Sequence, residues 1–160
     1  MTSNNPNASQ DLPQLTLTRI LNAPPSVVFD AWTQAERIAR WIAPDGFTVP
    51  EARSDARAGG EFYIVMRGPD GIDYPSIGHW GEMDKPNRLT WISAIPGPDG
   101  SNLMEDTTTA TFEALGSNQT RLTVHTQVTM MKDLGEEFAR GMEEGWNQSL
   151  NHLEAEVLRS

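Results

Sequence analysis

The sequence predicts one α+β domain, in which a curved antiparallel sheet of seven strands wraps around a long C-terminal helix, with two short helices after strand 1. Two observations predict this class. Apolar residues in the C-terminal stretch recur mostly four apart, which is the spacing of one stripe on an α-helix. Before that stretch, segments with a period of two are joined by short turns, as in antiparallel sheets. One helix covers seven strands only if the sheet curves around it, which leaves room for a cavity.

The first expected elements are a strand and two short helices. Leu15–Leu21 alternates and is rich in β-forming residues, so it predicts the first strand. The Pro24–Pro25 pair ends this strand, and a short helix over Ser26–Trp32 follows because proline suits the first helical turn. Thr33–Glu36 matches a capping box, which predicts a second helix that ends near Trp41.

Six further strands are expected between the second short helix and the C-terminal helix. Residues within each segment alternate, and turn sequences such as Gly68–Gly71 separate the segments. Pro50 makes the first of them less regular than the others. The predicted strands cover residues 48–56, 62–67, 73–84, 88–95, 105–115 and 119–129.

The C-terminal helix is expected over Asp133–Leu158, a length of roughly 40 Å. Its apolar stripe consists of Leu134, Phe138, Met142, Trp146, Leu150, Leu153 and Val157. Gly135, Gly141 and Gly145 each weaken a helix by roughly 1 kcal/mol relative to alanine, so we expect close backbone approach or open space beside them. The stripe therefore divides into a cavity wall from Phe138 to Trp146 and an anchor in solid core from Leu150 to Val157.

Composition excludes several classes of function. The 160 residues carry a formal charge of −10, with a pI near 4.6, and such a field repels nucleic acid and anionic lipid surfaces. The absence of cysteine excludes disulfides, thiolate metal sites and a cysteine nucleophile. Residues 1–13 have no signal-peptide pattern and are expected to form a disordered tail before a single domain at 14–160. No apolar run is long enough to span a bilayer, and a cytoplasmic location is expected.

The polar residues indicate neither a metal site nor a catalytic centre. His79, His125 and His152 lack metal-ligand spacing, and His79 is more typical of a surface histidine than of a ligand or catalytic group. Arg19 and Glu82 lie in strands among apolar residues, so each could anchor a ligand or form a structural ion pair. The chain has no nucleophile-elbow pattern, and we predict no cofactor and no catalytic residue.

Several stretches in order carry a resemblance to known proteins. They are Arg19–Pro24, Val28–Thr33, Ala39–Phe47, Gly59–Phe62, Met66–Gly71 with Tyr74–Pro75, and Glu144–Leu150. Together they resemble the SRPBCC/START-like superfamily, and within it the homologues of the activator of the heat-shock chaperone ATPase (AHSA-like proteins). Ile42 departs from the family where a second consecutive tryptophan is common, and Ala58 where a proline often precedes the paired glycines.

The resemblance implies a helix-grip fold with a hydrophobic cavity between the concave face of the sheet and the C-terminal helix. Members of the superfamily bind lipids, sterols, plant hormones or polyketides, and some act as cyclases. A homodimer is compatible with the resemblance. Since one fold serves many functions, the family alone does not assign one.

We therefore expect binding of a hydrophobic or amphipathic small molecule rather than catalysis. The candidate ligand-binding residues are Phe62, Ile64, Met66, Trp80, Trp91 and Phe112 from strands, and Phe138, Met142 and Trp146 from the helix. Methionine and tryptophan suit an adaptable apolar pocket, although the same residues could fill one another's space as ordinary core. Two alternatives stay open, namely a chaperone-associated interaction protein and a cyclase- or hydrolase-like enzyme that uses the cavity.

Overall fold

The computed structural model describes residues 12–132 and 140–159. In these residues the strands form one antiparallel sheet of seven, in the order β1-β7-β6-β5-β4-β3-β2. The strands are β1 (Gln14–Leu21), β2 (Thr48–Ser54), β3 (Glu61–Arg67), β4 (Asp73–Asp84), β5 (Arg88–Pro96), β6 (Asn102–Ala114) and β7 (Thr120–Met131). The helices are α2 (Pro25–Thr33), α3 (Ala35–Trp41) and α5 (Met142–Val157). This confirms the predicted fold class and element order.

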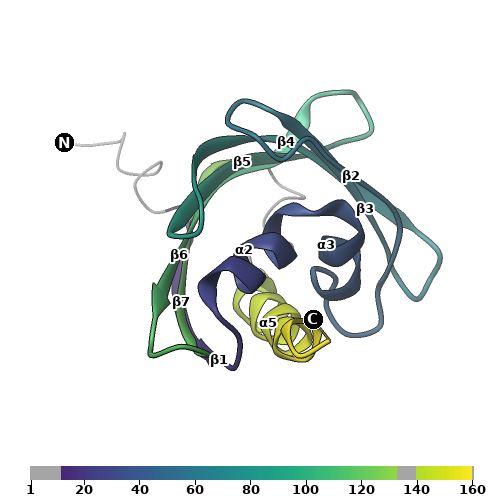
Figure 1. Ribbon diagram of the computed structural model, residues 1–160. Coiled ribbons are helices and arrows are strands. Elements are labelled where there is room, and N and C mark those ends of the chain that lie inside the picture. The colour runs from purple at the N-terminus through teal and green to yellow at the C-terminus, as the bar shows by residue number, and fades with distance from the viewer. Residues whose placement is uncertain (1–11, 133–139, 160) are drawn as a thin grey trace.

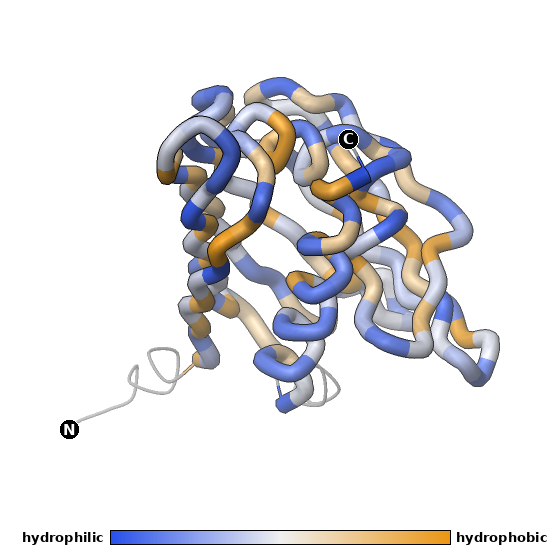
Figure 2. The backbone as a smooth tube through the Cα atoms, turned by 60° about the horizontal axis from the view of Figure 1, so that its bottom comes forward, coloured by the Kyte–Doolittle hydropathy of each residue, from blue (hydrophilic) through white to orange (hydrophobic). Residues whose placement is uncertain are grey.

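The sheet curves strongly, and the three helices of the described residues lie on its concave side (Figure 1). Hydrophobic and hydrophilic residues alternate along the strands, so that one face of the sheet is apolar and packs against the helices (Figure 2). β2 lies at an edge of the sheet, where the missing N–H of Pro50 costs no internal ladder hydrogen bond. The register of β2 against β3 shifts between Thr48 and Glu51, around this proline.

The predicted capping box at Thr33 is wrong. Thr33 is the last residue of α2, and its hydroxyl donates to the Phe29 carbonyl oxygen at 3.1 Å, one turn earlier. Gln34 is the N-cap of α3 and makes no side-chain capping bond. The threonine hydroxyl therefore stabilises the end of the first helix instead of the start of the second.

Helix α5 begins at Met142, because Gly141 before it has φ −91° and ψ 3° and acts as its N-cap. The prediction of one continuous helix from Asp133 is wrong at Gly141, after which α5 begins. Residues 133–139 of the predicted helix lie outside the described residues. The second half of the stripe is solid core, as predicted. Leu150, Leu153 and Val157 expose 0%, 0% and 2% of their surface.

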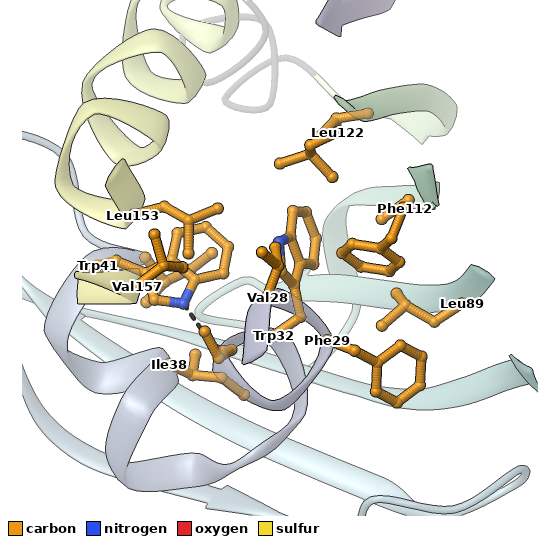
Figure 3. Close-up of a cluster of buried hydrophobic side chains, with 14 of the residues drawn as sticks. Val28, Phe29, Trp32, Ile38, Trp41, Leu89, Phe112, Leu122, Leu153 and Val157 are labelled. Carbon is orange, nitrogen blue, oxygen red and sulfur yellow. Dashed lines mark hydrogen bonds between the residues drawn. The ribbon is translucent and has the colours of Figure 1, made fainter. Parts of the chain in front are cut away.

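The core joins the helices to the sheet through large side chains. Trp32 and Trp41 are fully buried, and the Trp41 indole Nε1–H donates to the Ala31 carbonyl oxygen at 2.8 Å. Figure 3 shows Trp41 beside Leu153 and Val157, with Trp32 next to them on the side of the sheet. The C-terminal part of α5 is thus held by close packing.

Two polar contacts also fix α5. Arg19 of β1 donates to Glu154 at 2.8 Å and to Asn151 at 2.9 Å, so it forms a structural ion pair and is not a cavity anchor. Glu156 is only 3% exposed and accepts from Arg37 at 3.2 Å and from Arg40 at 3.1 Å, both on α3. These contacts hold the rear of the helix against β1 and α3, while its front half faces a cavity.

Candidate functional site

A cavity of about 650 Å³ lies between the first turns of α5, the segment after α3 and the concave face of β3 to β7. Its lining comes mainly from apolar side chains of these elements, with a few polar groups among them. The lining includes Phe62, Met66, Trp91, Met104, Asp106 and Trp146. A mostly apolar cavity of this size with few polar groups is typical of a small-molecule site.

Most of the residues nominated from the sequence meet in this cavity. Phe62, Ile64, Met66, Trp91, Met142 and Trp146 all line it. Trp80 and Phe112 do not belong to the lining, since they expose 1% and 3% of their surface and pack inside the core cluster. Phe138 lies outside the described residues.

Gly78 makes room for one wall of the cavity. It pairs with Phe62 across β3 and β4, and a Cβ at Gly78 would lie 2.5 Å from the Phe62 ring and 2.3 Å from the Ile92 carbonyl oxygen. No real Cβ tolerates these distances, so only glycine lets the Phe62 ring lie across the strand. A small residue in β4 thereby positions a large one in β3.

Stacked tryptophans form another wall. The ring centroid of Trp146 lies 6.1 Å from that of Trp91 and 6.0 Å from that of Trp32, with interplanar angles of 21° and 17°. Trp32 is completely buried behind the two lining residues. Because stacked aromatic rings have a preferred geometry, this cluster sets the distance of α5 from the sheet.

The face of α5 toward the cavity carries small or flexible side chains. Met142, Gly145 and Ser149 follow one another at helical spacings of three and four, and all three line the cavity. A Cβ at Gly145 would meet no atom within 4 Å, so this glycine borders open space. The Ser149 hydroxyl donates to the Ile42 carbonyl oxygen at 2.7 Å and ties the helix to the segment after α3.

Asp106 of β6 is a polar residue on the sheet side of the cavity. Ser93 on β5 donates to its Oδ1, and the hydroxyls of Thr108 and Thr126 lie 2.9 and 3.2 Å from its Oδ2. Burial raises the pKa of Asp106 above its ordinary value, although hydrogen bonds from these hydroxyls and from Trp91 act in the opposite direction. A carboxyl group with a raised pKa in an apolar cavity marks a candidate functional site.

The sequence reasoning did not nominate Asp106, although a signal for it was present. The alternation of the strand predicted over residues 105–115 places Asp106 on the same face as Thr108, Ala110 and Phe112. The last three expose 0%, 0% and 3% of their surface, so the pattern points Asp106 inward as well. An acid at an inward position of a strand is the kind of exception that indicates function.

Carboxylates are the charged groups in the described part of the lining. Asp45 and Glu144 lie at the segment after α3 and in the first turn of α5, and Asp106 lies on the sheet. No lysine, arginine or histidine contributes to the lining in residues 12–132 and 140–159. Asp45 is also bonded to α5, because its N–H donates to Gln148 Oε1 at 2.9 Å and its Oδ1 lies 2.7 Å from His152 Nε2.

The other polar candidates from the sequence lie away from the cavity. His79 is exposed on the sheet face opposite Trp80, as expected for a surface histidine. Glu82 forms a surface ion pair with Arg88 at 2.9 Å, so the alternative of a ligand anchor is wrong for it. Across residues 12–132 and 140–159, no group of histidine and acidic residues could hold a metal ion.

A second hollow of about 730 Å³ lies along β2, β3 and the segment between them. It is lined largely by charged and polar residues, including Arg53, Asp55, Arg57 and Glu61. Two of these charges pair with one another, since Arg57 lies 2.8 Å from Asp55. The cavity under α5, with its mostly apolar lining, is the better candidate site for a small molecule. None of the described helices is long and apolar enough to cross a membrane.

Comparison with known proteins places this architecture in a family. The family model described as "Activator of Hsp90 ATPase homolog 1-like protein" matches residues 22–157. A crystal structure of a Nitrosomonas europaea protein has 28% identity and a TM-score of 0.75, covering 91% of this chain and 94% of that one. A Chromobacterium violaceum protein has 25% identity and a TM-score of 0.78, covering 90% and 96%.

The family name also stands in the descriptions of solved structures. The AHSA1 protein of Silicibacter pomeroyi shares the fold with a TM-score of 0.74 at 22% identity, covering 91% of this chain and 98% of that one. No curated protein sequence matches the chain.

Proposed function

Because the chain belongs to the family of Activator of Hsp90 ATPase homolog 1-like proteins, we propose that it uses the cavity under α5 to bind a hydrophobic or amphipathic small molecule. The observation that carries this proposal is the space of about 650 Å³ between α5 and the concave face of the sheet, which opens to solvent and is lined mostly by apolar side chains. Small-molecule sites are typically apolar clefts of several hundred Å³ with a few polar groups. An apolar space of this size therefore has room for a small-molecule ligand.

The character of the walls supports the same proposal. Met66, Met104 and Met142 supply flexible, polarisable side chains that adapt to different apolar shapes. Trp91 and Trp146 supply rigid aromatic surface in the same cavity. This combination suits an apolar body, and the polar residue Asp106 suits a molecule with one polar end.

The test is a titration with Nile red, a neutral dye that fluoresces strongly in apolar surroundings. Gly145→Leu adds a large side chain where open space borders the helix, and Gly145→Ala is its matched control. We expect the wild type and Gly145→Ala to bind the dye, and Gly145→Leu to bind at least about tenfold more weakly because the cavity is filled. Equal binding by all three proteins, or by none, would count against the cavity as the site.

A second candidate is stimulation of the Hsp90 ATPase, which the family description supports. It predicts that the purified chain raises the ATP turnover of its own organism's Hsp90, whether or not the cavity is filled. Gly145→Leu separates the two candidates, because a chaperone-binding surface would tolerate it. An unchanged ATPase rate over a wide range of added chain would remove this candidate.

Three other expectations stay predictions. A cyclase or hydrolase needs an ionisable group in the cavity, and Asp106 is the group to mutate if turnover of a bound molecule is found. A cytoplasmic location and a homodimer would be checked by fractionation and by light scattering.

A further inference from the structure

Asp106 is a half-buried acid that has no basic partner among the described residues. Its contacts are hydroxyl and indole groups, and no arginine, lysine or histidine in the described residues forms an ion pair with it. This differs from Glu156, a buried acid, which is held by Arg37 and Arg40. Neutral donors stabilise a carboxylate but leave its net charge in the cavity.

The hydrogen bonds to Asp106 can also leave an acceptor position for a further donor. Thr108 and Thr126 lie 2.7 Å apart, and each lies within hydrogen-bond distance of Asp106 Oδ2. Two hydroxyls have two hydrogens for these three contacts, so when Thr108 donates to Thr126, Oδ2 accepts from Thr126 alone. In that arrangement Oδ2 can accept a further donor, and Ser93 and Thr126 line the same cavity.

Two exposed residues of the cavity lining add further negative charge. Asp45 and Glu144 line it from the segment after α3 and from α5, and the whole chain carries a formal charge of −10. A carboxylate or phosphate ligand would be repelled by these groups and would meet no base in the described lining. A cation would be attracted by the same negative charges.

We propose that the cavity selects cationic amphiphiles, namely primary amines with an apolar body, whose ammonium group donates hydrogen bonds to Asp106. The apolar body then lies along Met66, Met142 and Trp146. This inference rests on the proposed binding function and adds the charge of the ligand. Asp106 acts in it as a binding residue that recognises the polar end.

The test compares octylamine, octanol and octanoate, which share one apolar chain and differ only in the polar end. Binding is measured by calorimetry at neutral pH, where the amine is protonated and octanoate is ionised. We expect octylamine to bind at least about tenfold more tightly than octanol, and octanoate to bind more weakly than octanol. Equal affinity for octylamine and octanol would overturn the inference while leaving the cavity function standing.

Variants separate Asp106 from the overall negative charge. Asp106→Asn keeps the shape and removes the charge, and Glu113→Gln removes one charge from the same strand at a side chain that is 62% exposed. We expect Asp106→Asn to bind octylamine and octanol with about equal affinity, while Glu113→Gln keeps the preference for octylamine. Loss of the preference in both variants would assign it to general surface charge and overturn the inference.

A measurement on the wild type covers the case in which Asp106→Asn fails to fold. The carbon NMR signal of the Asp106 carboxyl group reports its pKa directly. Saturating octylamine should lower this pKa because the ammonium favours the ionised form, whereas octanol should not. A pKa unaffected by bound octylamine would contradict the inference, and binding of none of the three compounds would overturn the proposed function together with it.

Discussion

Trp91 of β5 and Trp146 of α5 stack with their ring centroids 6.1 Å apart and an interplanar angle of 21°. This contact joins the sheet to the helix at the place where solid core ends and the cavity begins. Both rings line the cavity, and Trp32, which is buried in the core, stacks with Trp146. The contact therefore supports the fold and shapes the site together.

Trp146→Ala should remove this support. We expect the free energy of unfolding to fall by about 2–4 kcal/mol, at or below the usual range for tryptophan because Trp146 is only partly buried. Trp146→Phe keeps an aromatic ring over Trp91 and should lose less than half of that amount. Urea denaturation of both variants measures the difference, and equal losses would show that stacking is unimportant.

Gly145→Ala should stabilise the chain. The added methyl group meets no atom within 4 Å, and alanine is better than glycine inside a helix by about 1 kcal/mol. Thermal unfolding should show a rise of about 2–4 °C in Tm, because a domain of about 150–250 residues shifts by this amount per kcal/mol. A fall in Tm would mean that the glycine is needed for a close contact.

Gly78→Ala should have the opposite effect, although it is the same substitution. Its methyl group would lie 2.3 Å from the backbone oxygen of Ile92 and 2.5 Å from the Phe62 ring. We expect a loss of about 1–3 kcal/mol from overpacking and a displaced Phe62 at the cavity wall. The variant should also bind Nile red more weakly than the wild type, and unchanged stability would contradict the assigned role of Gly78.

The raised pKa of Asp106 predicts a pH-dependent stability difference. Between the ordinary aspartate pKa and the raised one, the folded chain holds a proton that the unfolded chain has released. The contribution of Asp106 to the free energy of unfolding therefore falls as the pH rises through this window. The Asp106→Asn variant has no titrating group at this position. As the pH rises through the window, its free energy of unfolding relative to that of the wild type should therefore increase and then level off.

Urea unfolding of the wild type and Asp106→Asn over a series of pH values measures this difference. Glu113→Gln, at an exposed position of the same strand, is the control for a general loss of negative charge. A stability difference between Asp106→Asn and the wild type that is independent of pH would show that the carboxyl group titrates normally.

The element order was predictable because it depends on local periodicity. Alternation in the strands and the stripe in α5 survive in the structure, down to the burial of Leu150, Leu153 and Val157. The capping box failed because a threonine hydroxyl can bond backward to Phe29 as well as forward, and the local sequence does not decide between them. Helix continuity failed at Gly141 for a similar local reason.

The candidate site was only partly predictable, because the position of a cavity depends on how the helices pack on the sheet. Trp80 and Phe112 have the same inward register as Phe62 and Ile64, yet the first two lie in solid core. Their depth depends on how the helices sit on the curved sheet, which no strand pattern records. Asp106 could be placed inward by alternation, but its lack of a basic partner became visible only when β5, β6 and β7 were assembled.

Methionine methyl NMR during a titration with octylamine tests most directly whether a ligand binds in the cavity under α5. Met66, Met104 and Met142 line the cavity, whereas Met83 and Met130 do not and serve as internal controls. We predict that the methyl signals of the three lining methionines shift together with one dissociation constant, while those of Met83 and Met130 stay in place. Shifts spread evenly over all five, or confined to the controls, would contradict binding in the cavity.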